Sequence, residues 1–128
     1  MLTVRQVMSQ NHRPLHTISP DATVQGAVQI MASERIHALP VTVDDRLVGI
    51  VSEHDYVRKV AARGIPAWSV QVHEIMTRDV ITVTPDDSVR HCMKLMATNR
   101  IRHLPVMESG ALTAVISITD VVGTLDED

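Results

Sequence analysis

The chain of 128 residues is poor in aromatic and thiol side chains. Phenylalanine is absent, Tyr56 and Trp68 make up the aromatic 2%, and Cys92 is the single cysteine. Few rings are therefore present on which nucleic-acid bases could stack, and a net charge of −3 gives no general attraction for phosphate backbones. A lone cysteine excludes an intramolecular disulfide and fits a reducing compartment. We expect neither a nucleic-acid partner nor a disulfide scaffold.

Long apolar runs and glycine-rich loops are also lacking. No apolar run approaches the roughly 18 residues of a membrane span, and the N-terminal MLTVRQVMSQ lacks the long apolar core of a signal peptide. The five glycines are scattered and form neither a G-x-G-x-x-G motif nor a Walker-type phosphate loop. We therefore expect a cytoplasmic protein with no membrane partner.

Patterns typical of metal sites and of catalysis are missing as well. Among the seven histidines, His12 and His16 are four apart, but Pro14 between them prevents a helix from presenting both. The sequence contains no C-x-x-C and no H-E-x-x-H. Cys92 occupies the position that Ala27 has in an earlier helix, which indicates a small buried side chain rather than a nucleophile. We expect no metal site, no catalytic cofactor and no enzyme activity.

The main feature that is present is an internal repeat. Three blocks recur 65 positions later: HTISPDATV (16–24) as ITVTPDDSV (81–89), RIHALPV (35–41) as RIRHLPV (100–106), and GIVSEHD (49–55) as AVISITD (114–120). A fourth block, VRQVMS (4–9), resembles VHEIMT (72–77) at a shift of 68, so three extra residues fall within SQNHRPLHT (9–17). The chain therefore divides into repeat 1 (1–63), a linker with Gly64 and Pro66 (64–71), and repeat 2 (72–128).

Each repeat is predicted to fold as β-α-β-β-α, which gives a mixed α/β (α+β) fold class. A short strand near residues 16–18 precedes a helix over about 23–34, whose apolar residues Val24, Ala27, Val28 and Met31 have helical spacing. The same spacing recurs in repeat 2 at Val89, Cys92, Met93 and Met96. We expect the two repeats to pack together about an approximate two-fold axis.

The remaining elements of each repeat are a hairpin and a second helix. LPVTV and RLVGIVS flank a turn at residues 44–45, and LPVME and ALTAVIS flank a turn at 109–110. The second helix is predicted from near Ser52 to about Arg63, and its twin from Ser117 to the C-terminus. Arg58 and Lys59 are expected on a solvated face of the first of these helices.

A serine and an aspartate recur at the start of both second helices, as Ser52 with Asp55 and as Ser117 with Asp120. One interpretation is structural, because serine caps a helix and an acid in the first turn is favoured by the helix dipole. The other is functional. A helix start and a hydroxyl suit a phosphate, and a carboxylate accepts hydrogen bonds from two ribose hydroxyls. A phosphate beside a diol describes a nucleotide.

These motifs, taken in order, resemble a known family. The doubled pattern of I-M-T, T-x-x-P-D-x-(S/T)-V, R-I-x-x-L-P-V and G-h-x-S-x-x-D resembles the cystathionine-β-synthase (CBS) domain pair, or Bateman module, over about residues 4–125. The resemblance implies tandem β-α-β-β-α units with two clefts that bind adenine nucleotides. It also implies a stand-alone, non-catalytic pair that forms a homodimer.

The resemblance further implies which residues contact the ligand. One cleft would combine Ser52 and Asp55 with Ile81, Thr82, Val83, Arg102 and His103. The other would combine Ser117, Thr119 and Asp120 with Thr17, Ile18, His37 and Ala38. The first cleft is expected to be the better phosphate site, because Arg-His at 102–103 is more cationic than His-Ala at 37–38.

The sequence therefore predicts a regulatory, ligand-sensing module for an adenine nucleotide or adenosyl compound of the AMP, ADP, ATP, NAD or S-adenosylmethionine class. Binding would shift the geometry of an assembly. The alternative is a structural or protein-interaction (dimerisation) module whose clefts stay unoccupied. The intact Ser–Asp pairs favour the first function. The change from Gly49 to Ala114, which leaves the backbone less room, favours the second for one cleft.

Overall fold

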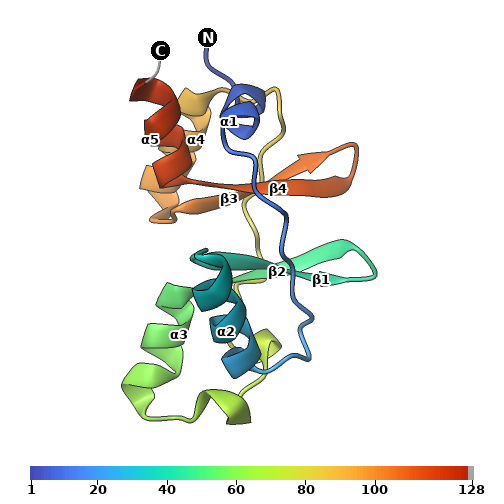
Figure 1. Cartoon of the computed structure of the whole chain (residues 1–128), viewed down its shortest axis with the longest axis vertical. Coiled ribbons are helices and arrows are strands. Elements are labelled where there is room, and N and C mark those ends of the chain that lie inside the picture. Colours follow the sequence, from blue (N-terminus) through green and yellow to red (C-terminus); the bar gives the residue numbers. More distant parts are fainter. Residues whose placement is uncertain (127–128) are drawn as a thin grey trace. The chain divides into compact units, whose positions relative to one another are not determined.

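The computed structural model describes residues 1–126, which form two compact units (Figure 1). Unit 1 holds residues 1–15 and the chain from residue 81 onward, and unit 2 holds residues 16–80. The elements of unit 1 are α1 (Val4–Gln10), α4 (Val89–Asn99), β3 (His103–Glu108), β4 (Ala111–Ser117) and α5 (Ile118–Asp126). Those of unit 2 are α2 (Val24–Glu34), β1 (Ala38–Val43), β2 (Arg46–Ser52), α3 (Glu53–Lys59) and the 3-10 helices η1 (Ala61–Arg63), η2 (Ala67–Ser69) and η3 (Val72–Glu74). None of these helices is long and apolar enough to cross a membrane.

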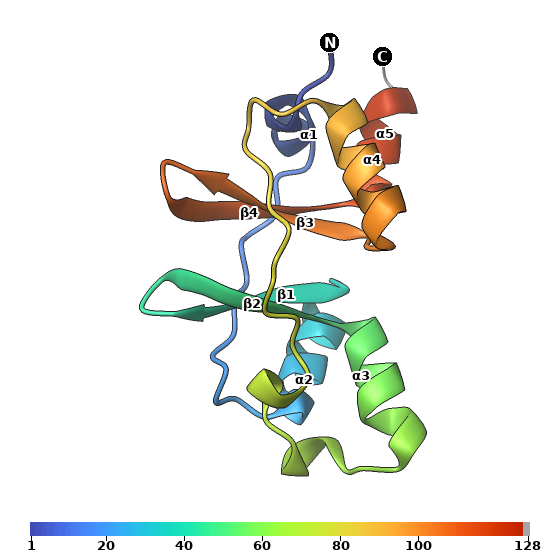
Figure 2. The same cartoon turned by 180° about the vertical axis from the view of Figure 1, so that it is seen from behind.

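Unit 2 is built on the hairpin of β1 and β2, which carries α2 and α3 (Figure 2). Its turn places Asp44 and Asp45 at φ 50° and 64°, a left-handed conformation that aspartate tolerates better than most residues. Leu39 and Val51 face each other in the strand register and are almost fully buried. The predicted helix over about 23–34 and the predicted hairpin are both confirmed.

Unit 1 repeats this arrangement with the hairpin of β3 and β4 and the helices α4 and α5. The turn at 109–110 has positive φ at Ser109 (53°) and Gly110 (80°). α1 packs on α4, α5 and β4, and its residues Val4 and Val7 are fully buried in the core of this unit. The mixed fold class with tandem repeats is therefore confirmed.

The sequence repeats and the compact units are offset from one another. Residues 1–15 belong to repeat 1 in sequence, yet they lie in the unit formed by the rest of repeat 2. Residues 72–80 belong to repeat 2 and lie in the unit formed by the rest of repeat 1, where Val72 is fully buried. Each unit therefore contains the first segment of the other repeat.

The strand predicted near residues 16–18 is not formed as a strand. Ile18 makes a single parallel bridge to β1, in which its amide donates to the Pro40 carbonyl at 3.0 Å and its carbonyl accepts from the Thr42 amide at 3.0 Å. A longer ladder would need N–H donors at Pro20 and Pro40, and proline has none. Val83 makes the equivalent single bridge to β3, flanked by Pro85 and Pro105.

The helix predicted from Ser52 to about Arg63 is shorter than expected. α3 ends at Lys59, and Val60 leaves the helical conformation at φ −125° and ψ −65°. A 3-10 turn follows up to Arg63, and Gly64 reverses the chain at φ 67°. The twin helix α5 begins directly after Ser117, as predicted, and residues 127–128 lie outside the described part of the chain.

The predicted helix stripes supply part of the core of each unit. Val89, Cys92 and Met96 of α4 are buried, as their spacing predicts. Met93 is the exception, because 44% of its surface is exposed although it follows the same spacing.

Gly49 has a packing role that accounts for the difference from Ala114. A Cβ at Gly49 would lie 2.6 Å from Met76 Sδ and 3.0 Å from the Thr77 carbonyl oxygen. Thr77 exchanges two backbone hydrogen bonds with Ile50, which hold this segment against β2. Glycine at position 49 therefore leaves room for Met76 and Thr77, which lie against β2 within the same unit.

Candidate functional site

The motif of Ser52 and Asp55 lies where β2 passes into α3. The Asp55 amide donates to Ser52 Oγ at 3.2 Å, and the Ser52 amide donates to Asp55 Oδ2 at 2.9 Å. The serine hydroxyl lies 3.1 Å from the same carboxylate oxygen. These reciprocal bonds form a capping box. The structural interpretation of this motif is confirmed, and its role towards a ligand stays a prediction.

Lys59 supplies a positive charge to this motif from one turn further along α3. Its Nζ lies 3.2 Å from Asp55 Oδ1 and donates to the Ile75 carbonyl at 2.8 Å. Arg58 and Lys59 are exposed, as expected, and Lys59 in addition joins α3 to the chain that follows η3. The Asp55 side chain keeps 14% of its surface exposed.

The motif of Ser117 and Asp120 has the same backbone geometry at the start of α5. The Ser117 amide donates to Asp120 Oδ2 at 2.9 Å, and the Asp120 amide donates to Ser117 Oγ at 3.1 Å. The position of Lys59 is taken here by Thr124, which is buried and donates its hydroxyl to the Asp120 carbonyl at 2.9 Å. The helix itself therefore brings no lysine to this carboxylate.

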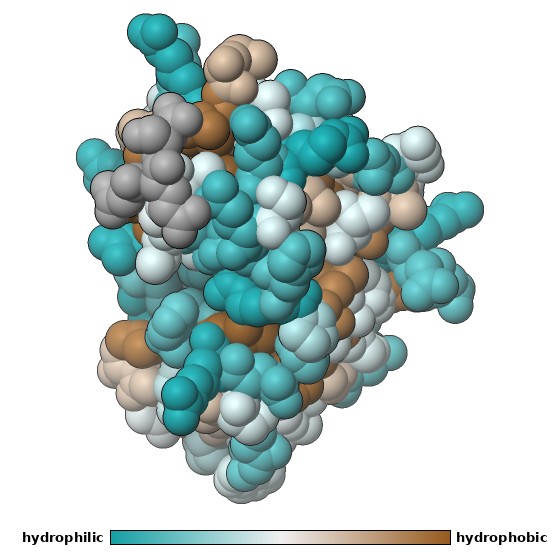
Figure 3. Space-filling view, turned by 45° about the horizontal axis from the view of Figure 1, so that its top comes forward, coloured by the Kyte–Doolittle hydropathy of each residue, from teal (hydrophilic) through white to brown (hydrophobic). Residues whose placement is uncertain are grey.

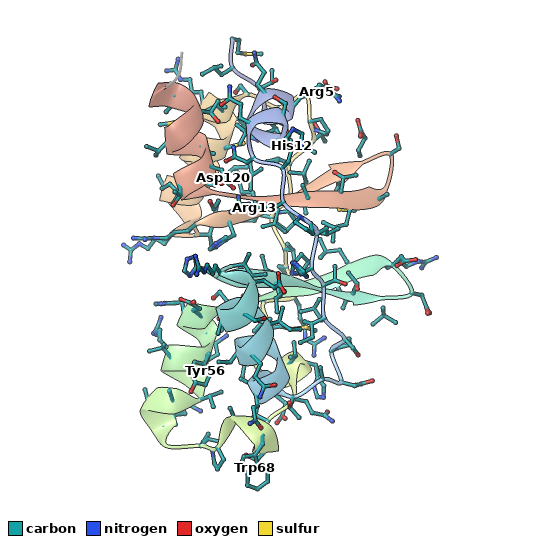
Figure 4. All side chains as sticks on the ribbon, viewed as in Figure 1. Arg5, His12, Arg13, Tyr56, Trp68 and Asp120 are labelled. Atoms are coloured by element: carbon teal, nitrogen blue, oxygen red, sulfur yellow. The ribbon has the colours of Figure 1, made fainter. Side chains whose placement is uncertain are left out.

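The cation that faces the Asp120 carboxylate is Arg13, which no pattern in the sequence indicated. Its guanidinium donates to Asp120 Oδ2 and forms an ion pair with it; both residues are labelled in Figure 4. The Asp120 side chain is only 6% exposed, whereas that of Arg13 is 48% exposed. Arg13 lies in the segment after α1 that carries the three extra residues of repeat 1. No local pattern points from that segment to a helix start 107 residues away.

Four further candidate residues lie in unit 2: Thr17, Ile18, His37 and Ala38. Ala38 pairs with Ser52 across the hairpin, and the Glu53 amide donates to the His37 carbonyl at 3.0 Å. His37 is exposed, and its Nδ1 lies 3.0 Å from Glu53 Oε1. Thr17 is exposed and Ile18 is buried. His37 and Ala38 therefore lie beside the Ser–Asp motif of their own unit.

The remaining candidates lie in unit 1: Ile81, Thr82, Val83, Arg102, His103 and Thr119. His103 pairs with Ser117 across the hairpin, and the Ile118 amide donates to the Arg102 carbonyl at 2.9 Å. Arg102, Thr82 and Thr119 are exposed, whereas Val83 is buried. Unit 1 therefore places its Arg-His pair beside its own Ser–Asp motif, as unit 2 does with its His-Ala pair.

The described side chains provide no cluster of three His, Cys, Asp or Glu residues suited to a metal ion. Cys92 is fully buried, and burial, with a smaller contribution from Asp87, raises the pKa of its thiol to about 11. A thiol with this pKa is almost entirely protonated at neutral pH and is a poor nucleophile. Cys92 thus acts as a core side chain.

Comparison with known proteins identifies the family. The model of the CBS domain matches residues 4–62 and 72–127. The chain therefore belongs to the CBS-domain family and contains a tandem pair of the repeats. Such pairs are in general regulatory modules that bind adenosine ligands, and stand-alone pairs are typically not catalytic.

Three relatives illustrate the similarity. A solved protein with CBS domains from Burkholderia ambifaria MC40-6 is 39% identical, with a TM-score of 0.94 over 98% of this chain and 95% of that one. The hexameric CBS-CP12 protein of bloom-forming cyanobacteria is 35% identical, with a TM-score of 0.85 over 95% of this chain and 71% of that one. CBS domain-containing protein CBSX3, mitochondrial, of Arabidopsis thaliana is 41% identical over 107 residues, which are 80% of this chain and 52% of that protein. The chain spans about half of CBSX3 and about a fifth of the next three curated relatives.

Proposed function

We propose that the chain is a ligand-sensing module that binds an adenine nucleotide or adenosyl compound of the AMP, ADP, ATP, NAD or S-adenosylmethionine class. Binding would change the geometry of an assembly and so regulate a partner protein. The observation that carries the proposal is the duplicated Ser–Asp pair at a hairpin-to-helix junction in a chain of the CBS-domain family. No catalytic cofactor takes part in this function.

The proposed contacts divide by chemistry. The carboxylates of Asp55 and Asp120 accept hydrogen bonds from a ribose diol, and the hydroxyls of Ser52, Ser117 and Thr119 donate to phosphate. Arg102, His103 and His37 supply charge or hydrogen bonds to phosphate. The backbone at 17–18, 38 and 81–83 contacts the purine edge. Single bridges at Ile18 and Val83 leave these segments with few ladder bonds, which supports this role.

A structural or interaction module is the second candidate, and one observation favours it. Both Ser–Asp pairs are already satisfied as helix caps, and Asp120 is also paired with Arg13. A capping role alone is therefore sufficient to explain why both residues occur twice.

Self-association is compatible with both candidate functions, the ligand sensor and the interaction module. We propose that the protein forms a homodimer in the cytoplasm. Apolar side chains remain exposed on helices of each unit: Val57 of α3 (53%), Met93 of α4 (44%) and Val122 of α5 (49%). The face in Figure 3 is mostly polar, with apolar patches between the polar side chains. A shallow depression of about 230 Å³ in unit 1 is lined partly by Met93 and Leu125. Exposed apolar patches of this kind are common at protein–protein contacts.

The test of ligand binding is isothermal titration calorimetry of nucleotide-free protein against AMP, ATP, NAD and S-adenosylmethionine. Micromolar binding by one of them supports the sensor, and the stoichiometry shows whether one motif or both are used. A ligand at 100 times its Kd should also stabilise the fold by about 2.7 kcal/mol, which melting would detect. If all four compounds fail to bind, the sensor is rejected in favour of the interaction module.

The residue assignment is tested separately with Asp55→Ala and Asp120→Ala. Each substitution should weaken binding at its own motif by at least about tenfold, because a charge-assisted bond to ribose is worth about 1.5–3 kcal/mol. Circular dichroism checks that each variant is folded. Unchanged binding by the folded double variant would show that the carboxylates do not contact the ligand.

A further inference from the structure

The two Ser–Asp motifs share their backbone geometry and differ in the cation that faces the carboxylate. Lys59 belongs to the same helix as Asp55 and contacts Oδ1. Arg13 comes from a segment outside the helix and donates to Oδ2 of Asp120, the oxygen that also accepts from the Ser117 amide. Asp120 is consequently the more buried of the two acids, with 6% of its side chain exposed against 14% for Asp55.

We propose that Arg13 determines the nucleotide affinity of the Ser117–Asp120 motif by occupying the carboxylate that would otherwise bind a ribose diol. The inference rests on the proposed function and adds a residue to it. With Arg13 in place, Asp120 is held by a partner of opposite charge, whereas a ribose hydroxyl offers the carboxylate a hydrogen bond without an opposite charge. A ribose hydroxyl must displace this partner before it can bind.

Arg13 is placed so that it can leave without unfolding the unit. It lies between α1 and the start of unit 2, outside any helix or strand. Its side chain is half exposed, so the guanidinium would be hydrated once released. Only molecules in which Arg13 has released Asp120 can bind the ribose. The apparent Kd of the motif therefore equals its intrinsic Kd divided by the fraction of molecules in that state.

A matched control exists in the other unit. Arg78 follows the block 72–77 as Arg13 follows the block 4–9, and it is also exposed. Arg78 donates to the His73 carbonyl at 3.4 Å. Because Arg78 contacts a carbonyl of its own segment, replacing Arg78 removes a similar charge without removing a partner of Asp120.

The experiment measures AMP and 2′-deoxy-AMP binding by calorimetry in the full chain. Asp55→Ala serves as the background, so that the remaining binding belongs to Asp120. Adding Arg13→Ala should tighten AMP binding by at least about tenfold and tighten 2′-deoxy-AMP binding much less, because 2′-deoxy-AMP keeps only one of the two hydroxyls that the carboxylate binds. Adding Arg78→Ala should change neither. In an Asp120→Ala background, Arg13→Ala should not alter AMP binding at the Asp55 motif.

Arg13→Gln is the second variant, because Arg13→Ala leaves a buried carboxylate without its cation and could lower stability. Glutamine keeps an N–H donor without the charge, so an intermediate gain in AMP affinity is expected. Unchanged or weaker AMP binding in both folded Arg13 variants would overturn the inference and leave the proposed function standing if the Asp55 motif still binds. Absence of AMP binding in every protein, the parent included, would overturn both.

Discussion

Asp55 and Asp120 show how one residue type at equivalent positions acquires two environments. Both accept the amide of the preceding serine and begin a helix. One is paired with a lysine of its own helix, and the other is covered by an arginine from a distant segment. The Ser–Asp motif determines the hydrogen bonds between the serine and the aspartate three residues later. The ion pair of Asp120 with Arg13 depends on the path of the rest of the chain.

This difference predicts unequal costs of substitution. Asp55→Ala should lower the free energy of unfolding by about 1 kcal/mol through loss of the capping box. Asp120→Ala should cost more, about 1–3 kcal/mol, because Asp120 is the more buried of the two acids and its loss leaves Arg13 without its partner. Urea denaturation of the two variants measures both values. Equal costs would indicate that the Arg13 pair adds nothing to stability.

Cys92 makes stability depend on pH in the alkaline range. Its pKa is raised from 9.0 to about 11, so the folded chain favours the protonated thiol. The corresponding stabilisation is complete below pH 9 and is lost as the pH rises towards 11, because the unfolded thiol ionises first. The loss is on the order of 2 kcal/mol, at 1.36 kcal/mol per pKa unit.

The control for this prediction is Cys92→Ala, which removes the thiol and keeps the other titrating groups. Unfolding free energies of the parent and the variant are compared at pH 8 and pH 11. The difference between the two proteins should shrink or reverse sign as the pH rises. A difference that stays constant over this range would show that the buried thiol does not titrate as inferred.

At the scale of elements, prolines and close backbone contacts limit what the apolar pattern can form. Pro20 and Pro40 restrict the pairing of Ile18 to one bridge, and Pro85 and Pro105 do the same for Val83. β2 carries a glycine where Met76 and Thr77 lie against it. The equivalent position of β4 is Ala114, which packs against the core of unit 1.

Gly49→Ala is therefore predicted to destabilise the protein by about 1–3 kcal/mol, the usual cost of overpacking. The added Cβ would meet the Thr77 carbonyl oxygen at 3.0 Å and Met76 Sδ at 2.6 Å. Ala114→Gly is the matched control and should cost only about 0.5–1 kcal/mol, the ordinary penalty of glycine in a strand. Thermal melting distinguishes the two. A neutral Gly49→Ala would mean that Met76 repacks without cost.

At the scale of the whole molecule, each compact unit is completed by a segment of the other sequence repeat. Val4 of α1 is fully buried in unit 1, and Val72 of η3 is fully buried in unit 2. A mutation in the first residues of a repeat should therefore weaken the unit formed by the other repeat.

Hydrogen exchange of Val4→Ala and Val72→Ala tests this exchange of segments. Each truncation should cost about 2–3 kcal/mol at a fully buried site. Val4→Ala should reduce protection mainly in α4, β3 and β4, and Val72→Ala mainly in α2, β1 and β2, because local opening reports local stability. The reverse pattern would show that the units follow the sequence repeats.

Much of the local structure could be predicted from sequence. The helix over about 23–34, both hairpins and the start of α5 follow from helical spacing, turn residues and cap residues that lie within a few positions. The strand predicted near residues 16–18 is reduced to a single bridge, although the prolines that restrict it are visible in the sequence. The end of α3 was missed because Val60 leaves the helix while its side chain is fully buried.

The sequence by itself determined the duplication, the hairpin with its preceding and following helix in each repeat, and the serine caps, because these depend on residues close together along the chain. Only the tertiary structure decided that α1 completes the unit of the second repeat, that Lys59 joins α3 to Ile75, and that Arg13 covers Asp120. Periodicity and capping are local properties. The contact of Arg13 with Asp120 joins residues 107 positions apart, and it exists only because the segment after α1 passes the start of α5.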